Sequence, residues 1–375
     1  MRFPGFTGGW ESRKIGEDCS VLMCKRIFAH QTSEQGDVPF YKIGTIGAEP
    51  DAYISRELFE DYKAKYNYPR EGEVMVTCAG TVGKTIVFNG DDSYYQDSNI
   101  VWLSNPKQLY LNSFLNYYLS RVNWNKLNST TITRIYNDNL RELIIKYPSV
   151  EEQEKIVSLL SLLDQRIAVQ NKVIEDLKKL KTALCEHLYN ETNPNCRIGD
   201  IVEQSSVRNR AKNALTVLSV SNRYGFIAQA EQFEERSIAS EDTTNYKVVS
   251  LNDFAYNPAR INVGSIARLK SYDKGIVSPM YICFRCKDGT YPEFLEHFFS
   301  TKSFSLEMEK RLEGSVRMCL SYEGLCNIQI FLPPLVQQKS ISEKISALNR
   351  KVQLEENYLY ALINQKQYLL SKLFI

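Results

Sequence analysis

The chain has 375 residues, more than the roughly 100–200 that one ordinary core accommodates, so at least two domains are expected. Its composition, with 43% hydrophobic and 24% charged residues, is typical of folded proteins and excludes a disordered chain. The formal net charge is only +2, from 46 basic and 44 acidic residues. This balance excludes a surface uniformly covered with phosphate-binding cations, although it is compatible with a local basic face.

No segment approaches the ~18 consecutive apolar residues that a membrane helix needs, so none is expected. The start, MRFPGFTGGW, has proline and glycine where a signal peptide would have an apolar run, which predicts a cytoplasmic location. The nine cysteines are scattered and odd in number, as expected for reduced thiols. Cys283 and Cys286 form a C-x-x-C without a second pair, inside a strand-like segment, so no metal site is predicted.

The most informative feature is an internal repeat, in which residues 148–189 correspond to residues 333–374 at a constant offset of 185. Both copies are predicted to be long helices, one starting with an S-x-x-E capping box at Ser149 and the other with two prolines at Pro333. Apolar residues recur at alternating steps of four and three, which predicts a coiled coil. The expected seam includes Leu163, Ile167, Gln170, Ile174, Leu177 and Lys181 in the first helix, and Leu348, Val352, Glu355, Leu359, Leu362 and Lys366 in the second.

The polar seam residues suggest how the two helices pair. In one antiparallel register, Gln170 lies opposite Lys366 while Lys181 lies opposite Glu355. Buried polar pairs are a known means of fixing the register of a coiled coil, so this register is our hypothesis. The alternative is that positions 170 and 181 lie at exposed edges of the seam.

The segments before the helices also repeat, with a drifting offset, which indicates a duplicated scaffold that carries different loops. We therefore expect an α+β fold with a pseudo-two-fold internal repeat. Two similar mixed α/β domains, 1–147 and 193–332, are separated by two long helices, 148–192 and 333–375, packed as an antiparallel coiled coil. Strands are expected at 73–77, 85–88, 100–103, 217–220, 254–257 and 280–284, last strands at 140–145 and 325–330, and shorter helices at 112–122 and 292–310.

The order of these segments resembles type I restriction-modification specificity subunits, which consist of a target-recognition domain, a conserved helix, and a second copy of each. The opening RFPGF at 2–6 and the KIGE motif at 14–17 are similar to the start of that family. The helix entries, at Pro148 and Pro333, are similar to its helix-entry pattern. The resemblance covers nearly the whole chain, and the repeat is its most specific part.

The resemblance implies a non-catalytic subunit that recognises a bipartite site in double-stranded DNA, with one half-site for each globular domain. The helices would set the spacer, and lengthening them would lengthen it. Two modification subunits would dock on the chain to form an adenine-N6 methyltransferase, and restriction subunits would add an ATP-dependent endonuclease. S-adenosylmethionine, ATP and Mg are then expected on these partners and no cofactor in this chain.

Phosphate-binding and catalytic motifs are incomplete. The segment 80–84 resembles a P-loop, but the required first glycine falls at Cys78 and the loop is two residues short. Asn257-Pro258 lacks the second proline and the aromatic residue that adenine methyltransferases use to hold a flipped base. Asp91-Asp92 is typical of a solvated turn. We therefore expect no catalytic residue.

DNA contacts are expected on loops at matched places of the two halves, where side chains able to read bases or bind phosphates recur. Gly83 and its counterpart Gly264 are interpreted as glycines of a turn or a close approach. For each candidate the alternative is an ordinary solvated residue, and their recurrence favours contacts. The candidates are Lys42, Thr45, Thr81, Lys84, Arg134 and Tyr136, then Arg208, Arg210, Lys212, Ser221, Asn222, Arg223, Arg260, Asn262 and Arg317.

The charge is evenly distributed, with a net charge of 0 for 1–147, −2 for 148–192, +1 for 193–332 and +3 for 333–375. No segment is strongly cationic, so we expect weak DNA binding by the chain alone, with partner subunits supplying affinity. The competing hypotheses are a coiled-coil scaffold that binds proteins without DNA specificity, which the low charge favours, and a DNA-modifying enzyme with an unrecognised site.

Overall fold

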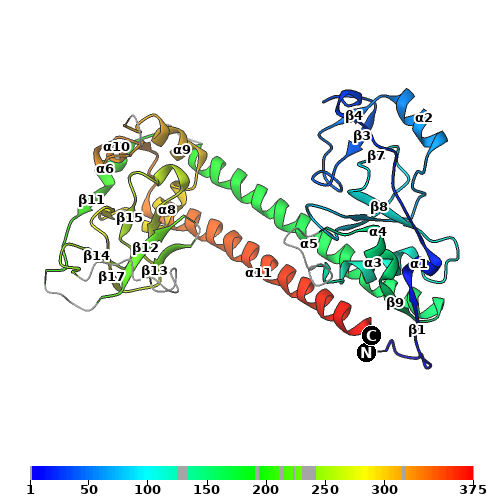
Figure 1. Ribbon diagram of the computed structural model, residues 1–375. Coiled ribbons are helices and arrows are strands. Elements are labelled where there is room, and N and C mark those ends of the chain that lie inside the picture. Colours follow the sequence, from blue (N-terminus) through cyan, green and yellow to red (C-terminus); the bar gives the residue numbers. More distant parts are fainter. Residues whose placement is uncertain are drawn as a thin grey trace. The chain divides into compact units, whose positions relative to one another are not determined.

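The computed structural model describes residues 2–124, 134–190, 194–210, 215–222, 224–229, 242–314 and 318–374. They divide into two compact units: unit 1 comprises Met1–Gln170 and Tyr358–Ile375, and unit 2 comprises Asn171–Asn357. Each unit contains a globular part and portions of two long helices (Figure 1). Within the described ranges, no helix is long and apolar enough to cross a membrane.

The main sheet of unit 1 has the strand order β2-β8-β5-β6, and all neighbours are antiparallel. Successive side chains of β5 serve two cores because they point to opposite faces of the sheet. Val74 and Val76 join a core with Phe114, whereas Met75 joins a second core with Phe59. The strands of this sheet are β2 (Ser20–Leu22), β8 (Ile100–Ser104), β5 (Val74–Thr77) and β6 (Thr85–Val87).

Unit 1 also contains a smaller sheet of order β4-β3-β7, in which β3 and β7 are parallel, and an antiparallel pair, β1-β9. The strands are β1 (Glu11–Lys14), β3 (Val38–Tyr41), β4 (Tyr53–Ile54), β7 (Tyr94–Tyr95) and β9 (Ile144–Tyr147). The helices are α1 (Ile15–Asp18), η1 (Ala29–Gln31), α2 (Arg56–Lys65), α3 (Asn112–Ser120) and α4 (Asn137–Glu142).

Unit 2 repeats this topology. Its antiparallel sheet β11-β18-β15-β16 matches β2-β8-β5-β6, and β10-β19 matches β1-β9. Its other sheet, β13-β12-β17-β14, contains a parallel pair, β12-β17, in the place of β3-β7. The shared strand order confirms the duplicated α+β scaffold predicted from the sequence.

The strands of unit 2 are β10 (Cys196–Arg197), β11 (Val202–Ser205), β12 (Val217–Ser221), β13 (Gly225–Ala228), β14 (Lys247–Ser250), β15 (Phe254–Tyr256), β16 (Ile266–Arg268), β17 (Lys274–Val277), β18 (Ile282–Cys286) and β19 (Gln329–Ile330). Its helices are α6 (Ile198–Ile201), η3 (Ile261–Val263), α8 (Pro292–Phe298), α9 (Lys302–Glu309) and α10 (Tyr322–Cys326).

The two long helices are α5 (Val150–Asn190) and α11 (Leu335–Leu373). Within unit 1, Lys366 of α11 forms an ion pair with Asp164 of α5. Within unit 2, Lys178 pairs with Glu356. From the first pair to the second, the residue number rises along α5, from 164 to 178, and falls along α11, from 366 to 356, which confirms the antiparallel direction.

The two predicted polar pairs do not form, although Glu356, the partner of Lys178, lies within one helical turn of the position that the predicted register gives. Lys366 pairs with Asp164, six positions before the expected Gln170, and this is more than one helical turn. Glu355 pairs with Lys351 on its own helix rather than with Lys181. The sequence hypothesis matched polar residues within the seam, whereas a lysine side chain is long enough to reach a carboxylate outside it.

Two buried glutamines fix the start of each long helix in the same way. The Gln153 amide nitrogen donates to the Leu109 and Pro148 carbonyls, and its oxygen accepts from Leu111 N–H at 2.8 Å. Gln338 makes the matching three bonds in unit 2, where its oxygen accepts from Tyr291 N–H at 2.7 Å. We call each set of three bonds a glutamine lock.

The far ends of the long helices also pack alike. Phe374 follows α11 and packs on Phe114 of α3, with ring centroids 4.9 Å apart at 37°. Tyr189, near the end of α5, packs on Phe294 of α8, with centroids 4.8 Å apart at 36°. The repeat therefore extends from strand order to the geometry of single side chains.

Three local predictions need correction. The Glu152 carboxylate does not complete a capping box with Ser149 but binds Arg2 and the N–H of Phe3. The helix expected at 292–310 is two helices, α8 and α9, because the Thr301 hydroxyl caps a new helix start. The last strands expected at 140–145 and 325–330 are shorter, since α4 and α10 occupy their first residues.

Candidate DNA interface

One edge of the main sheet gathers the candidate residues of unit 1. Because β5 runs antiparallel to β6 and β8, the end of β5 lies beside the starts of both neighbours. The loop 78–84 begins at this edge, and the segment 134–136 joins it through a bond from Ile135 N–H to the Cys78 carbonyl at 2.9 Å. Sequence-distant candidates thus meet at one place.

The turn after β3 belongs to the same cluster. Lys84 Nζ donates to the Ile46 carbonyl at 2.6 Å, which ties the loop 78–84 to the turn that holds Lys42 and Thr45. Within that turn, the Lys42 N–H donates to Thr45 Oγ1, and Lys42 pairs with Asp51. Lys42 and Lys84 therefore already have intramolecular partners, whereas Thr81 lies exposed in its loop.

Arg134 and Tyr136 complete the cluster of unit 1. The Arg134 guanidinium donates to the Ser98 carbonyl at 3.2 Å and lies 5.9 Å from the centre of the Tyr136 ring. Tyr136 is 61% exposed, so its ring is available to a partner. Ser98 has a φ of 53°, a left-handed conformation that few residues other than glycine adopt, and the sequence analysis did not identify it.

The corresponding edge of unit 2 carries different side chains. The loop of η3, between β15 and β16, holds exposed Arg260 and Asn262. Ser265 Oγ, after that loop, donates to the Val220 carbonyl at 3.2 Å, and so places the loop beside Ser221 and Asn222 at the end of β12. The structure thus brings four of the predicted residues of unit 2 together.

Arg208 and Arg210 lie elsewhere. The Arg208 backbone bridges to Lys247 of β14, and its side chain donates to Asn245. Because β17 lies between β14 and β12, this basic segment is next to the outer strand β14, two strands away from Ser221. The candidates Lys212, Arg223 and Arg317 lie outside the described residues.

The unit 2 edge also carries exposed apolar side chains that are not among the residues predicted from the sequence. Tyr224, Val263 and Met280 are 68%, 52% and 58% exposed. They lie after β12, in η3 and just before β18, next to the predicted polar residues. Such side chains can contact thymine methyl groups or base faces, but a search for polar residues alone does not detect them.

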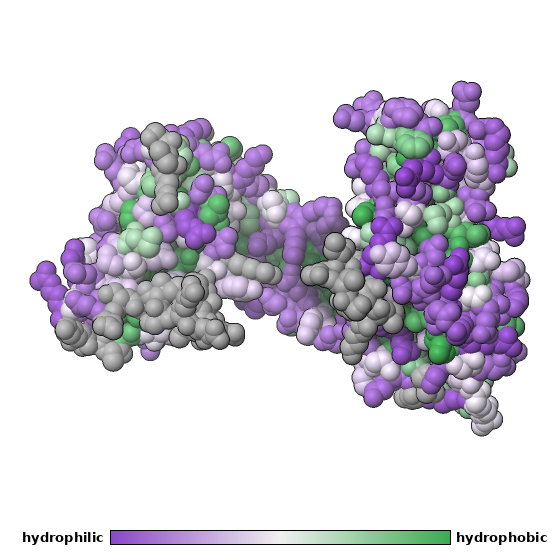
Figure 2. Space-filling model, viewed as in Figure 1, coloured by the Kyte–Doolittle hydropathy of each residue, from purple (hydrophilic) through white to green (hydrophobic). Residues whose placement is uncertain are grey.

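Much of the visible face of each unit is hydrophilic (Figure 2). The Asp91-Asp92 turn is a structural feature, since Asp92 binds Arg56 and Lys63, and these two bonds lower the pKa of the Asp92 carboxyl. Cys283 and Cys286 lie on β18, where burial raises both thiol pKa values to about 12. In the described part of the chain, no three His, Cys, Asp or Glu side chains form a group that could hold a metal.

The loop 78–84 does not have the architecture of a P-loop. It connects two antiparallel strands, and no helix begins at Lys84, so it offers no helix N-terminus for a phosphate. Gly83 has a φ of 80°, and a Cβ there would overlap the Trp124 ring. Gly83 is thus both a turn and a close-approach glycine, as the sequence predicted.

Part of the chain is similar in sequence to type I restriction enzyme specificity proteins. Residues 7–179 match the family model of the type I restriction modification DNA specificity domain. A Haemophilus influenzae protein, described as a candidate type I restriction enzyme specificity subunit, is 46% identical over 164 residues, 44% of this chain and 42% of that protein. The resemblance to type I restriction-modification specificity subunits is confirmed. The region matched in the Haemophilus influenzae protein is less than half of that protein's length.

More distant relatives cover more of the chain. The type I restriction enzyme MjaVIII specificity subunit of Methanocaldococcus jannaschii is 24% identical over 259 residues, which is 60% of each chain. The crystal structure of the type I restriction-modification system S subunit from M. genitalium has a TM-score of 0.61 at 16% identity, covering 100% of this chain and 99% of that one. This structural likeness establishes the fold across both repeats.

Proposed function

We propose that the chain is the specificity subunit of a type I restriction-modification complex and that it recognises a bipartite DNA site. The main support for this proposal is that the same sheet edge in both units bears exposed side chains that differ between the units. A shared scaffold with different edge residues is suited to reading two different half-sites. Unit 1 would use Thr81, Arg134 and Tyr136, and unit 2 would use Asn222, Arg260 and Asn262.

The arrangement favours base reading over strong phosphate binding. Arg and Asn side chains make bidentate contacts with guanine and adenine edges, and a lost bidentate pair costs about 1–3 kcal/mol of discrimination. The charge of Lys42 is offset by Asp51, and the Lys84 ammonium is held by the Ile46 carbonyl, so both are less available to phosphates than the sequence suggested. The isolated chain is therefore expected to bind DNA weakly, and docked subunits would add phosphate contacts.

Partner subunits would carry the chemistry. Two modification subunits would dock on the repeated parts, bind S-adenosylmethionine and methylate adenine N6, and restriction subunits would use ATP and Mg. Two copies of one scaffold offer two equivalent surfaces to two copies of one partner. Competing hypotheses, a protein-binding scaffold or an enzyme in its own right, are outcomes of the test below.

The test maps methylated sites on a random DNA library treated with this chain and its modification subunit. The double variant Arg260→Ala, Asn262→Ala is expected to relax one half-site and leave the other unchanged, and exposed Lys344→Ala serves as the control. Changes in both half-sites would contradict the assignment of one unit to each. Methylation by the chain alone would refute the non-catalytic role, and no sequence preference in the complex would favour a scaffold.

The helices would act as a ruler for the spacer. Seven residues inserted into both α5 and α11, which preserve the heptad phase, lengthen each helix by about 10 Å at 1.5 Å per residue. This corresponds to about three base pairs at 3.4 Å each. The methylated site should keep both half-sites and gain about three base pairs of spacer. An unchanged spacer would refute the ruler and leave half-site reading intact.

A further inference from the structure

Unit 1 contains a carboxylate held between its helices. Asp164 of α5 pairs through Oδ1 with the ammonium of Lys366 on α11. Its Oδ2 accepts a hydrogen bond from the Tyr117 hydroxyl of α3 at 2.7 Å. Lys366 Nζ also lies 5.5 Å from the centre of the Tyr117 ring. One carboxylate is thus bound by an ammonium and a hydroxyl where three helices meet.

At the matching positions of unit 2, two of these three residues differ and the lysine is kept. The offset of the glutamine locks relates Asp164 to Asn349 and Lys181 to Lys366, and the offset of Phe114 and Phe294 relates Tyr117 to His297. Unit 2 therefore keeps the lysine but has a neutral amide where unit 1 has the carboxylate. Lys181 is therefore present without a carboxylate at the position that matches Asp164.

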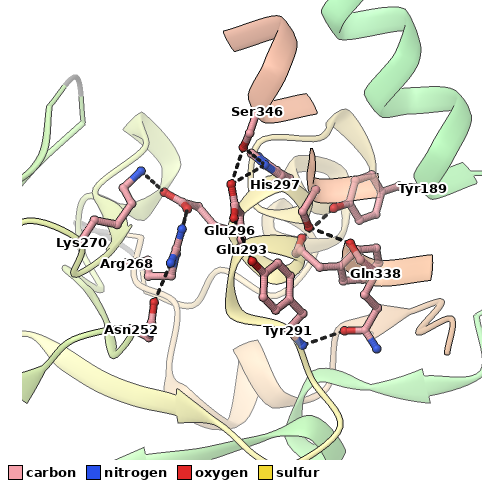
Figure 3. Close-up of polar contacts among 12 residues, drawn as sticks. Tyr189, Asn252, Arg268, Lys270, Tyr291, Glu293, Glu296, His297, Gln338 and Ser346 are labelled. Carbon is pink, nitrogen blue, oxygen red and sulfur yellow. Dashed lines mark hydrogen bonds and ion pairs between the residues drawn. The ribbon is translucent and has the colours of Figure 1, made fainter. Parts of the chain in front are cut away.

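These residues line a cavity of about 330 Å³ within unit 2, together with Arg350, Ser346 and the Arg268–Glu296 region. Its own carboxylates already have partners, as Figure 3 shows: Glu296 binds Arg268 at 2.9 Å and Lys270 at 2.7 Å. Glu293 accepts hydrogen bonds from Ser346 and Tyr291. Among the described residues, neither Lys181 nor Arg350 forms an ion pair.

The cavity therefore has an excess of positive charge. Four cations, Lys181, Arg268, Lys270 and Arg350, face two carboxylates. Burial lowers the pKa of His297, which leaves its imidazole neutral at neutral pH and available for hydrogen bonding. His297 Nε2 lies 3.2 Å from Ser346 Oγ, so the two polar groups meet at the wall of the cavity (Figure 3).

We propose that this cavity binds a small carboxylate ligand. The ligand would lie beside Lys181 as the Asp164 carboxylate lies beside Lys366 in unit 1. Unit 1 serves as the internal reference, because it shows the same lysine position holding a carboxylate. Arg350 provides a second cation, which favours a dicarboxylate of the size of malonate. A cavity of 330 Å³ has room for it, since a water molecule occupies about 30 Å³.

The chain has three histidines, so ligand binding beside His297 can be followed directly by NMR. The side-chain NMR signal of His297, assigned by its loss in His297→Gln, is followed while sodium malonate replaces sodium chloride at constant ionic strength and pH. The His297 signal is expected to shift in a saturable way, while the signals of His30 and His187 stay unchanged. Equal shifts of all three signals would show a non-specific ionic effect and overturn the proposal.

Two variants separate binding from general stability. Asn349→Asp supplies an internal carboxylate to Lys181 and is expected to abolish the malonate response, as is Lys181→Met, while exposed Lys172→Met retains it. Circular dichroism checks that each variant is folded. A response that survives in folded Asn349→Asp would overturn the proposal. So would a response to phosphate at equal ionic strength in the absence of any response to malonate.

Discussion

Unit 1 and unit 2 share a scaffold but not the residues at its edges. The strand order of the main sheet, the glutamine locks and the packing of the helix ends are the same in both units. In contrast, the exposed edge, the glycine turns and the site between the helices differ in charge and shape. Buried contacts therefore maintain the scaffold, whereas residues that face solvent or a cavity are free to acquire separate roles.

The aromatic contacts at the helix ends should give the largest effects. Phe374→Ala and Tyr189→Ala each remove a buried ring, and each is expected to cost ~3–5 kcal/mol of unfolding free energy. Denaturant unfolding measures both, with Tyr368→Ala, which is 59% exposed, as the control. Similar losses are expected because the two ring pairs have similar geometry. A loss in only one variant would show that the units are not equivalent in energy.

The glutamine locks should follow. Gln153→Leu and Gln338→Leu each leave an N–H and two carbonyls without their partner, at a cost of ~2–4 kcal/mol. Exposed Gln337→Leu next to one lock is the matched control and should be nearly neutral. The measurement is again the free energy of unfolding. Retained stability in either lock variant would contradict the proposed importance of the amide.

The matched glycines should respond unequally. Gly83 and Gly264 both have positive φ, so alanine at either position costs ~1 kcal/mol in backbone strain. At Gly83 the added methyl group also overlaps the Trp124 ring, whereas at Gly264 the nearest atom, Asn222 Cβ, is 3.6 Å away. Gly83→Ala should therefore lose ~2–3 kcal/mol in all and Gly264→Ala ~1. Equal losses in thermal or denaturant unfolding would refute the close approach.

The carboxylate of unit 1 should give the smallest effect. Asp164→Asn removes a partly exposed ion pair with Lys366 and is expected to cost ~0.5–1 kcal/mol. The reverse change, Asn349→Asp in unit 2, should stabilise by a similar or smaller amount. Comparing the two variants by denaturant unfolding at low and high salt tests the ionic origin, because salt screens both effects. A salt-independent loss in Asp164→Asn would point to the Tyr117 hydrogen bond instead.

The sequence was sufficient for the long helices and the duplicated scaffold. Apolar residues at steps of four and three persist over both copies, and period and offset are properties that a sequence displays directly. Gly83 was also interpreted correctly, since a turn that needs a positive φ and a close contact are the main physical reasons for a glycine in a short loop. The grouping of Lys84 with Lys42 and Thr45 could not be obtained in this way, because it depends on which strands become neighbours.

Side-chain partners were less predictable. Lys366 and Gln170 were matched by seam position, but Asp164 lies outside the seam and competes for the same ammonium. Glu152 satisfies a capping pattern locally, yet it binds Arg2, which is distant in sequence. In both cases a partner with full charge displaced a neutral one, and neither a seam pattern nor a capping pattern contains information about such competitors.

The packing of Phe374 against Phe114 has a consequence for synthesis. Unit 2 is one continuous stretch, Asn171–Asn357, so all of its contacts are available once that stretch has left the ribosome. Unit 1 draws Leu373 and Phe374 into its core, where they join side chains made more than 200 residues earlier. The part translated first is therefore completed last, and its core must wait, partly open, until residue 374 emerges.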